Sequence, residues 1–300
     1  MRAVVNTIKG PVVTGVDDPR PRGDETLVAV RAFSLNRGEL ALLKTRTDDW
    51  RPGQDIAGVV VEPAADGTGP AAGTRVVALV EAAGWAELAA VPVERTAILP
   101  DTVSVEQAAA LPLAGLTALR TLRLGGDLLG RRVLVTGANG GVGRLQVQLA
   151  ALAGAEVTAV ARPERQKELL AFGARAVVVA PEAAEGLYDL VADWAGGPSL
   201  ATGIAKIRPG GTVVVGSGNA EKTPLNLYDF FGHEGARLVG YLSYAYPEPP
   251  GPDLSTLVGL VASGRLDPSV GLSLPWEHLD EALSALAERR LSGKAVLSIG

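Results

Sequence analysis

The chain contains no cysteine and only two histidines among its 300 residues. The absence of cysteine excludes disulfide bonds, thiolate nucleophiles and sulfur ligands for a metal. His233 and His278 lie in the second half of the chain without a set of acidic or sulfur partners at ligand spacing, so we expect both at the surface or at a helix end. The sequence therefore predicts no metal site.

Long apolar runs and an excess of basic residues are also missing. No run of ~18 apolar residues occurs that could cross a membrane. The first residues, MRAVVNTIKGPVV, have too short an apolar segment for a signal peptide and no small-residue cleavage pattern. A net charge of -5 leaves no basic surface of the kind that phosphate backbones need. We therefore expect a soluble cytoplasmic protein without a membrane or nucleic-acid partner.

What the chain does contain is ample apolar material, since 47% of its residues are hydrophobic. A chain of this length suits one large domain or two ordinary ones. The first 112 residues predict a β-rich, barrel-like domain with one helix over residues 36–44, because short apolar runs alternate there with Gly, Pro and Asp. These runs are residues 3–5, 27–33, 56–62, 75–80 and 86–91.

From about residue 105 the pattern changes to helices alternating with strands. This alternation predicts a parallel, doubly wound sheet that binds ligands at the carboxyl ends of its strands. The expected strands are residues 133–136, 157–160, 176–179, 189–193, 212–215 and 237–242. After the proline-rich break at residues 247–250, two helices and two strands could complete the first domain.

A glycine-rich segment, RVLVTGANGGVGRLQVQL, occupies residues 132–149. It begins as an apolar strand, passes through a turn and continues as a helix. Ala138, Gly140 and Gly143 fill the three small-residue positions of the dinucleotide-binding fingerprint, so backbone N–H groups can approach a pyrophosphate at the helix N-terminus. A purely structural turn is the alternative. The predicted cofactor residues are Asn139, Gly140, Gly141, Val142 and Gly143.

The next strand of such a unit ends in the sequence ARPERQK, residues 161–167. An NAD site normally has an acidic residue at this strand end to hold the ribose hydroxyls, and none stands there. Arg162, with Arg165 or Lys167 as further candidates, can donate charge-assisted hydrogen bonds to a 2′-phosphate. We therefore predict NADPH rather than NADH, with Ala161, Arg162 and Arg165 near it. The alternative is an exposed first turn of a helix over residues 164–171.

Several motifs follow one another in a recognisable order: SLNRGELALL, RPGQDIAGVVVE, GTRVVALVEAAGWAELAAVP, AALPLAGLTALRTL, VLVTGANGGVG and GKAVLSIG. In this order they resemble the medium-chain dehydrogenase/reductase superfamily, and within it the zinc-independent quinone oxidoreductase and enoyl reductase branch. The resemblance implies an α/β fold with a GroES-like catalytic domain, a Rossmann domain, a cleft at their junction and a homodimer. It assigns residues 1–112 and 247–300 to the catalytic domain, and residues 113–246 to the NADP-binding Rossmann domain.

The resemblance also bears on metal chemistry. Zinc-dependent members bind the metal through cysteine and a Gly-His-Glu motif, whereas this chain has Gly53-Gln54-Asp55 at that place. Gln54 and Asp55 could instead hold a turn. Without a Lewis acid, the hydride acceptor must already be activated, as a quinone or an α,β-unsaturated carbonyl compound is.

Individual residues also receive roles from the resemblance. Asn36 matches an asparagine near the nicotinamide and the substrate, and Asn36 and Tyr241 are the candidate catalytic residues. Each has an ordinary alternative, since Asn36 could cap a helix and Tyr241 could be a core aromatic. Thr117 matches a cofactor-binding threonine but could be helix interior. The residues matching the nicotinamide-binding end are Gly216, Ser217, Tyr241 and Leu242.

Three positions depart from the family pattern. Glu39 stands in place of an aspartate, Ala41 in place of a tyrosine, and Ala180 in place of a tyrosine that flanks the adenine. Because an aromatic acid is missing at position 41, we expect the proton to come from water or from Tyr241. Ala41 and Trp50 are candidate lining residues of a substrate pocket, and Trp85 could line it or belong to the core.

These observations together predict an NADPH-dependent reductase that transfers hydride to a small quinone or enone. Two alternatives remain open at the level of sequence. One is a non-catalytic NADPH-binding sensor that regulates a partner. The other is an enzyme with the same fold that performs a non-redox biosynthetic step.

Overall fold

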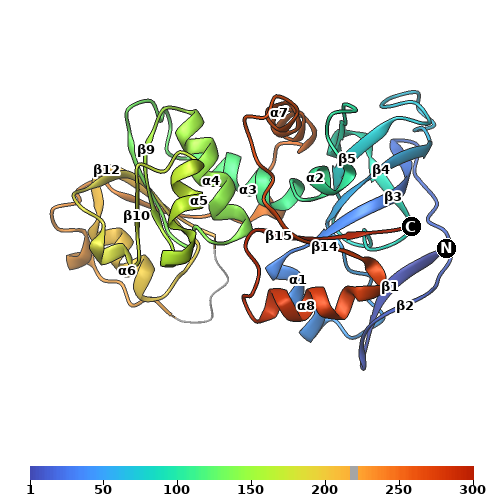
Figure 1. Ribbon diagram of the computed structural model, residues 1–300, viewed down its shortest axis with the longest axis horizontal. Helices are drawn as coiled ribbons and strands as arrows, with labels where there is room; N and C mark the ends of the chain where they lie inside the picture. The colour runs from blue at the N-terminus through green and yellow to red at the C-terminus, as the bar shows by residue number, and fades with distance from the viewer. Residues whose placement is uncertain (217–221) are drawn as a thin grey trace. The chain divides into compact units, whose positions relative to one another are not determined.

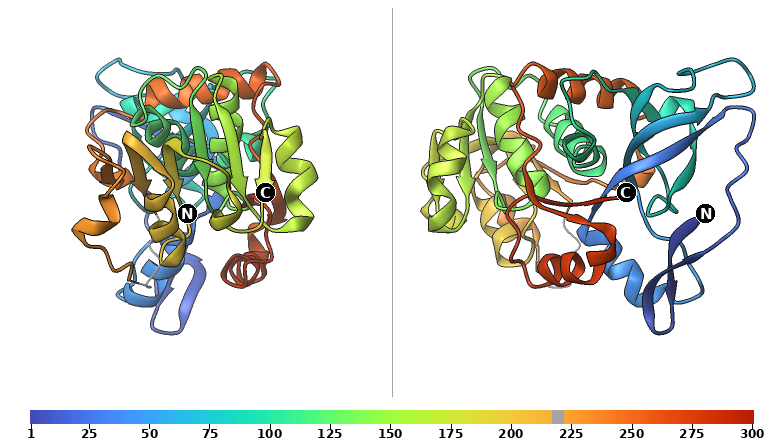
Figure 2. Two further views of the ribbon diagram at one scale, coloured as in Figure 1. Left: turned by 90° about the vertical axis from the view of Figure 1, so that its left-hand side faces the viewer. Right: turned by 45° about the vertical axis from the view of Figure 1, so that its right-hand side comes forward.

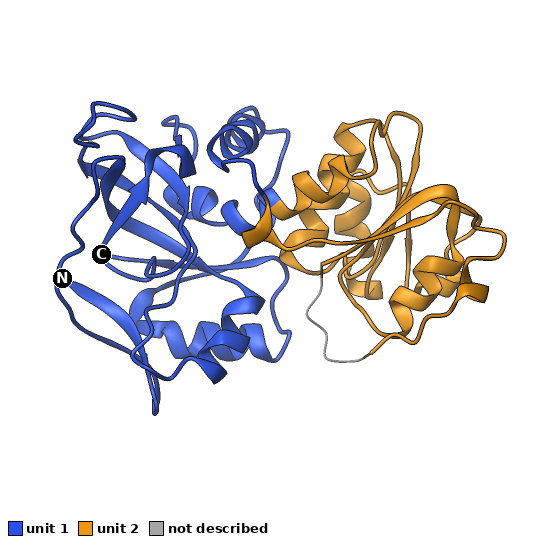
Figure 3. Ribbon diagram, turned by 180° about the vertical axis from the view of Figure 1, so that it is seen from behind, with its two compact units in different colours: residues 1–116, 247–300 blue, residues 117–246 orange. Residues whose placement is uncertain are grey.

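The computed structural model describes residues 1–216 and 222–300 (Figure 1). The chain forms two compact units (Figure 3). Unit 1 consists of Met1–Leu116 and Pro247–Gly300, so both ends of the chain contribute to it. Unit 2 consists of Thr117–Tyr246. The first division lies within helix α3, Pro112–Arg123.

A six-stranded parallel sheet forms the centre of unit 2. Its strands are arranged in the order β10-β9-β8-β11-β12-β13, which confirms the doubly wound Rossmann sheet expected from the sequence. The strand order reverses between β8 and β11, and this switch point is where such sheets bind their ligands. The strands are β8 (Arg132–Val135), β9 (Glu156–Val160), β10 (Ala176–Val178), β11 (Tyr188–Asp193), β12 (Ile207–Val215) and β13 (Arg237–Gly240).

Helices connect these parallel strands. α4 (Gly141–Leu152) joins β8 to β9, α5 (Gln166–Ala171) joins β9 to β10, and α6 (Pro198–Ala205) joins β11 to β12. Because such crossovers are right-handed, the reversal of strand order places α4 and α5 on one face of the sheet and α6 on the other (Figure 2). Residues 143–150 of α4 are buried, polar side chains included, which anchors the helix with its N-terminus at the switch point.

Unit 1 is rich in β-structure, as expected from the alternating apolar runs. A seven-stranded sheet has the order β14-β15-β3-β4-β5-β7, with β6 paired to β3, and β1 and β2 form a separate hairpin. The strands are β1 (Arg2–Thr7), β2 (Gly10–Gly15), β3 (Glu25–Leu35), β4 (Asp55–Glu62), β5 (Arg75–Leu79), β6 (Leu88–Pro92), β7 (Thr96–Ile98), β14 (Val270–Pro275) and β15 (Lys294–Ser298).

The sequence did not indicate β2 and β7. β2 contains Pro11 and leaves most of its side chains exposed, so it lacks the alternation of apolar and polar residues that marks a half-buried strand. β7 has only three residues. Both strands form because a neighbour, β1 for β2 and β5 for β7, supplies an edge on which they pair.

Four helices belong to unit 1 besides the start of α3: α1 (Arg37–Thr45), α2 (Val105–Ala109), α7 (Gly251–Ala262) and α8 (Leu279–Ala287). The core beneath them is built around three aromatic side chains. Phe33 stacks on Trp85 with ring centroids 5.6 Å apart and meets Trp276 edge-on at 6.4 Å. Trp85 is fully buried and is therefore a core residue. Among the helices described, none is both long and apolar enough to span a membrane.

Candidate active site

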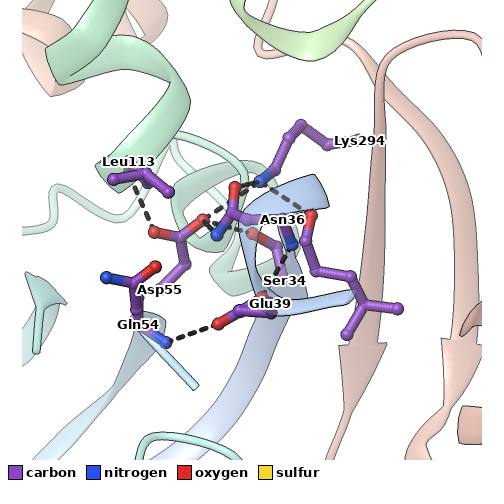
Figure 4. Close-up of polar contacts among 8 residues, drawn as sticks. Ser34, Asn36, Glu39, Gln54, Asp55, Leu113 and Lys294 are labelled. Atoms are coloured by element: carbon purple, nitrogen blue, oxygen red, sulfur yellow. Dashed lines mark hydrogen bonds and ion pairs between the residues drawn. The ribbon is translucent and has the colours of Figure 1, made fainter. Parts of the chain in front are cut away.

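A group of polar residues is buried where three strands of unit 1 come together (Figure 4). β3 ends beside the start of β4 on one side and the start of β15 on the other, with Ser34 opposite Asp55 and Leu35 opposite Ala295. This register brings residues from distant parts of the chain into contact. We call the following set the buried polar cluster: the side chains of Ser34, Asn36, Glu39, Asp55 and Lys294 with the backbone N–H groups of Gln54 and Leu113.

Asp55 is the centre of this cluster. Its Oδ2 accepts hydrogen bonds from Ser34 Oγ at 2.7 Å, from Asn36 Nδ2 at 2.8 Å and from Lys294 Nζ at 3.0 Å. Its Oδ1 accepts the backbone N–H of Leu113 at 2.8 Å. A carboxylate with no exposed surface is costly unless it is paired and hydrogen-bonded, and these four donors meet that requirement.

Lys294 supplies the compensating charge. Its side chain is 4% exposed, and its Nζ donates to the Leu35 carbonyl at 3.0 Å and to Asn36 Oδ1 at 2.5 Å as well as to Asp55. An ammonium has three N–H donors, so all three find acceptors. The ion pair is therefore a fully satisfied buried pair.

Glu39 forms a second part of the cluster. Its carboxylate accepts the Asn36 backbone N–H at 2.7 Å and the Gln54 backbone N–H at 3.0 Å, which ties the first turn of α1 to the residue before β4. Burial raises the pKa of Glu39 to about 8, and the charge of Asp55 acts in the same direction. The two backbone hydrogen bonds and the charge of Lys294 oppose this rise without cancelling it. Glu39 is therefore mainly protonated at neutral pH.

The donor set of the cluster does not suit zinc. It offers two carboxyl groups without histidine or cysteine, and one of them, Asp55, is already paired with an ammonium. In the part of the chain that the structure describes, no three His, Cys, Asp or Glu residues gather as metal ligands. His278 precedes α8, 3.5 Å from Glu281, and His233 Nδ1 lies 2.5 Å from the Ile207 carbonyl.

In unit 2, the glycine-rich turn leads into the N-terminus of α4 at the switch point. A Cβ atom at Gly143 would lie 2.7 Å from the Gly137 carbonyl oxygen and 2.8 Å from Ala138 Cα, so the packing of the turn requires this glycine. A Cβ at Gly140 would meet nothing closer than 3.4 Å. The fold therefore does not require glycine at 140, whereas a ligand approaching the backbone would.

Asn139 adds a second sign of a ligand at this turn. Its Oδ1 is buried without a hydrogen-bond partner among the described residues. A buried acceptor without a donor is destabilising, and a hydroxyl of a bound ligand could supply the donor. The turn, with backbone N–H groups of Gly141 and Val142 at the helix start, thus fits the pyrophosphate and ribose of a dinucleotide.

A hydrogen-bonded network fixes the strand ends on either side of the switch point. Thr136, after β8, donates to Asp193 Oδ1 at 2.6 Å, and the Trp194 backbone N–H donates to Thr136 Oγ1 at 3.1 Å. Trp194 Nε1 donates to Gln146 of α4 at 2.5 Å. The indole ring lies so close to Gly216 that a Cβ there would be 2.0 Å from it. Gly216 is therefore required by Trp194.

The predicted 2′-phosphate residues lie after β9. Ala161 is buried, and its N–H donates to the Val178 carbonyl at 2.9 Å. Arg162 is half-exposed and pairs with Glu164 at 3.2 Å. Arg165 lies 3.8 Å from Glu168, a residue that also pairs with the buried Arg144. Since surface ion pairs are weak, a phosphate could displace the acidic partner of Arg162.

The remaining predicted cofactor residues lie in several settings. Thr117 is buried within α3, and Leu242 is exposed. Tyr241 is 8% exposed, its backbone N–H donates to the Val215 carbonyl, and its ring centroid lies 5.9 Å from that of Tyr246. Ser217 lies outside the described residues.

The two candidate catalytic residues belong to different units, Asn36 to unit 1 and Tyr241 to unit 2. Asn36 occupies the N-cap position of α1, as the alternative interpretation expected, but its side-chain amide contacts Asp55 and Lys294. Neither predicted pocket residue belongs to this cluster. Ala41 is on the exposed side of α1, and half-buried Trp50 lies 5.5 Å from the guanidinium of Arg46.

Sequence reasoning did not assign a role to Lys294, and it noted Glu39 only as a departure from a pattern. A lysine at the start of the otherwise apolar segment KAVLS was the available signal for a buried charge. Asp193 and Trp194 were missed because nothing local marks a strand-end side chain as part of a network.

The chain is similar to several known proteins. The family profile described as "Zinc-binding dehydrogenase" matches residues 141–262. The chain is 34% identical over 287 residues to the spectinabilin polyketide synthase system protein NorB of Streptomyces orinoci, a match that covers 91% of this chain. The chain spans only 13% of the length of NorB.

Two other relatives are similar over nearly their whole length. A chloroplast envelope quinone oxidoreductase homolog of Arabidopsis thaliana is 28% identical, covering 93% of this chain and 91% of the relative. An acryloyl-coenzyme A reductase of Metallosphaera sedula is 26% identical, covering 99% and 100%. Among solved structures, the quinone oxidoreductase from Coxiella burnetii matches the fold with a TM-score of 0.86 at 24% identity, covering 100% of this chain and 99% of the other.

Proposed function

Because the chain belongs to the medium-chain dehydrogenase/reductase superfamily of oxidoreductases, we propose that it is an NADPH-dependent, zinc-independent reductase. Its acceptor in this proposal is a quinone or an α,β-unsaturated carbonyl compound. The nicotinamide supplies the hydride when the cofactor is bound. Unit 2 holds the cofactor, and unit 1 provides the buried polar cluster.

The observation that carries the proposal is the turn before α4. Gly140 leaves space that the fold does not need, and Asn139 Oδ1 is a buried acceptor without a donor among the described residues. Both features suit a dinucleotide at the helix N-terminus. The preference for NADPH rests on Arg162 and Arg165 after β9, where an NAD site would have an acid.

The acceptor class is proposed from the chemistry of unit 1 and from two relatives. Asp55 and Lys294 already neutralise one another, so the cluster offers no Lewis acid that could polarise an unactivated alcohol or aldehyde. Quinones and enones accept hydride without that help. The relatives named for quinone oxidoreduction and for acryloyl-coenzyme A reduction are consistent with these two acceptor types.

We also propose that a second copy of this chain is the protein partner. β13 is the last strand of the unit 2 sheet among the described residues, so one of its edges is open for pairing. Exposed apolar side chains occur on β13 and on the short helices before and after it, η4 (Leu227–Phe230) and η5 (Ser243–Ala245). They are Leu227, Tyr228, Leu238 and Tyr244.

The proposed function is tested by mixing the purified protein with NADPH and a panel of quinones and enones. We expect oxidation of NADPH, followed at the absorbance band of the reduced nicotinamide, to depend on one acceptor class and to survive exhaustive chelation. Stoichiometric zinc lost together with activity would overturn zinc independence. Tight NADPH binding without oxidation above the solution background would favour the sensor or the non-redox enzyme.

A further inference from the structure

The side-chain amide of Asn36 is held at both ends. Its Oδ1 accepts the Lys294 ammonium at 2.5 Å, and its Nδ2 donates to Asp55 Oδ2 at 2.8 Å (Figure 4). Rotating the amide by half a turn would place its NH₂ group against the ammonium and its oxygen against the carboxylate. Both contacts would then be repulsive, so the charges of the ion pair select one orientation of the amide.

This arrangement leaves Asn36 with one N–H that no described contact uses. An asparagine amide has two N–H donors, and only one is directed to Asp55. The contacts with Lys294 and Asp55 hold the plane of the amide. The direction of the remaining N–H is therefore fixed by the ion pair.

We propose that Lys294 is a positioning residue that acts through Asn36. This inference rests on the proposed reductase function and adds to it that Asn36, a candidate catalytic residue, contacts the acceptor. When hydride adds to an enone or a quinone, the displaced electron pair accumulates on the acceptor's carbonyl oxygen, and a proton from water completes the reduction. An N–H donor that is already fixed in direction stabilises that oxygen as its charge develops. Lys294 thus orients the donor without itself touching the acceptor.

The alternative is that Lys294 only stabilises the fold. The two roles can be separated. If Lys294 positions Asn36, its effect on kcat must vanish when Asn36 is absent, whereas a purely structural effect on kcat persists without Asn36. The comparison needs the variants Lys294→Met, Asn36→Ala and their combination. Met keeps most of the length of the lysine side chain and removes its charge.

A matched control is available on β3, the strand that also carries Ser34 of the cluster. Thr26 lies in β3, is fully buried, and donates one side-chain hydrogen bond to the Glu62 carbonyl at 2.8 Å. Its side chain takes no part in the hydrogen bonds of the buried polar cluster. Thr26→Val removes this buried hydrogen bond while nearly preserving the side-chain shape, so it reports the effect of a small loss of stability alone.

The experiment measures kcat, KM for the acceptor, Kd for NADPH and thermal unfolding for each variant. We expect Lys294→Met to lower kcat at least tenfold without changing the Kd for NADPH, and Thr26→Val to leave kcat within about twofold. In the Asn36→Ala background, adding Lys294→Met should change kcat less than twofold. Equal losses in both backgrounds, or an unchanged kcat in folded Lys294→Met, would overturn the proposal.

A second variant keeps the test decisive if Lys294→Met does not fold. The combination Asp55→Asn with Lys294→Met removes both charges and leaves no buried ion unpaired. Its kcat should still fall at least tenfold relative to Asp55→Asn alone, and an unchanged kcat would refute the positioning role. If the wild-type protein reduces no acceptor, the proposed function and this inference are refuted together. If the wild-type protein is active but Lys294→Met lowers kcat equally with and without Asn36, the inference alone is refuted.

Discussion

Lys294 and Asp55 lie 239 residues apart in the sequence, yet their side chains form an ion pair at 3.0 Å in which neither side chain is more than 4% exposed. The pair joins the starts of β15 and β4 through the end of β3, which lies between these two strands in the sheet. The desolvation cost of burying both charges is offset only because every donor and acceptor of the two groups is satisfied.

Breaking this pair should destabilise the protein strongly. Lys294→Met leaves Asp55 as a buried uncompensated charge, so we expect the free energy of unfolding to fall by about 3–5 kcal/mol. Adding Asp55→Asn should recover part of this loss. Arg290 pairs with Glu288 at 2.6 Å on the surface, and Arg290→Met should cost less than about 1 kcal/mol. Urea denaturation measures the free energy of unfolding of the three variants. If Lys294→Met lowers it as little as Arg290→Met does, the buried pair does not contribute to stability.

Glu39 should make stability depend on pH. Its folded pKa of about 8 lies above its unfolded value, so the folded state holds the proton more tightly between about pH 4.5 and pH 8. The contribution of this proton is fully present below that range and is lost as the pH rises through it. The slope reaches at most about 1.4 kcal/mol per pH unit.

Glu39→Gln isolates this effect. The amide cannot ionise, so the part of the pH dependence that is due to Glu39 should disappear. Overall stability should also fall, because the Gln NH₂ group would face one of the two backbone N–H groups that now donate to the Glu39 carboxyl group. Urea unfolding of both proteins from pH 5 to pH 9 provides the comparison. Parallel curves would show that Glu39 ionises normally in the folded protein.

Two glycines of the turn before α4 should respond differently to the same substitution. Gly143→Ala places a Cβ 2.7 Å from the Gly137 carbonyl oxygen, so we expect a loss of stability of roughly 1–3 kcal/mol. Gly140→Ala meets only ordinary contacts in the protein and should unfold like wild type, but it should weaken NADPH binding about tenfold or more. Thermal unfolding measures the stability of both variants, and fluorescence titration measures their affinity for NADPH. Unchanged NADPH affinity in Gly140→Ala would argue against a pyrophosphate at this turn.

Cofactor choice should depend on Arg162. Arg162→Ala should weaken NADPH binding by about 1.5–3 kcal/mol and leave NADH binding nearly unchanged, because only NADPH carries the 2′-phosphate. Arg175→Ala is the control, since Arg175 is an exposed arginine of the same unit that pairs with Glu156 at the start of β9. Calorimetric titration with both cofactors measures the difference. Equal losses for NADPH and NADH would remove Arg162 as the phosphate ligand.

The open edge of β13 should determine the oligomeric state. Leu238 on β13 is 41% exposed, and Leu238→Lys should place a charge in the proposed interface and convert a dimer to a monomer. Val61 of β4 is similarly exposed in unit 1, and Val61→Lys should not change the mass. Light scattering coupled to size exclusion reads the mass of each. A monomeric wild type would refute the proposed partner.

The sequence was most informative where the signal is local. The strand, turn and helix over residues 132–149 follow from apolar periodicity and glycine placement, and the β-rich first part follows from alternation. Lys294 could not be assigned in this way, because its partner Asp55 comes next to it only through the pairing of β3 with both neighbours. The role of Glu39 could not be assigned from the sequence either, because the backbone N–H of Gln54 comes within hydrogen-bond distance of it only after folding.

The origin of unit 1 in two separate segments has a consequence for biosynthesis. All of unit 2 leaves the ribosome before Pro247, so its parallel sheet can close while translation continues. β3 must wait for β15, one of its sheet partners, because Lys294 at the start of β15 is made 259 residues after Leu35 at the end of β3. During that interval Asp55 has no ammonium beside it and one edge of β3 is uncovered. Until β15 is made, this edge of β3 can therefore be bound by a chaperone or can pair wrongly with another chain.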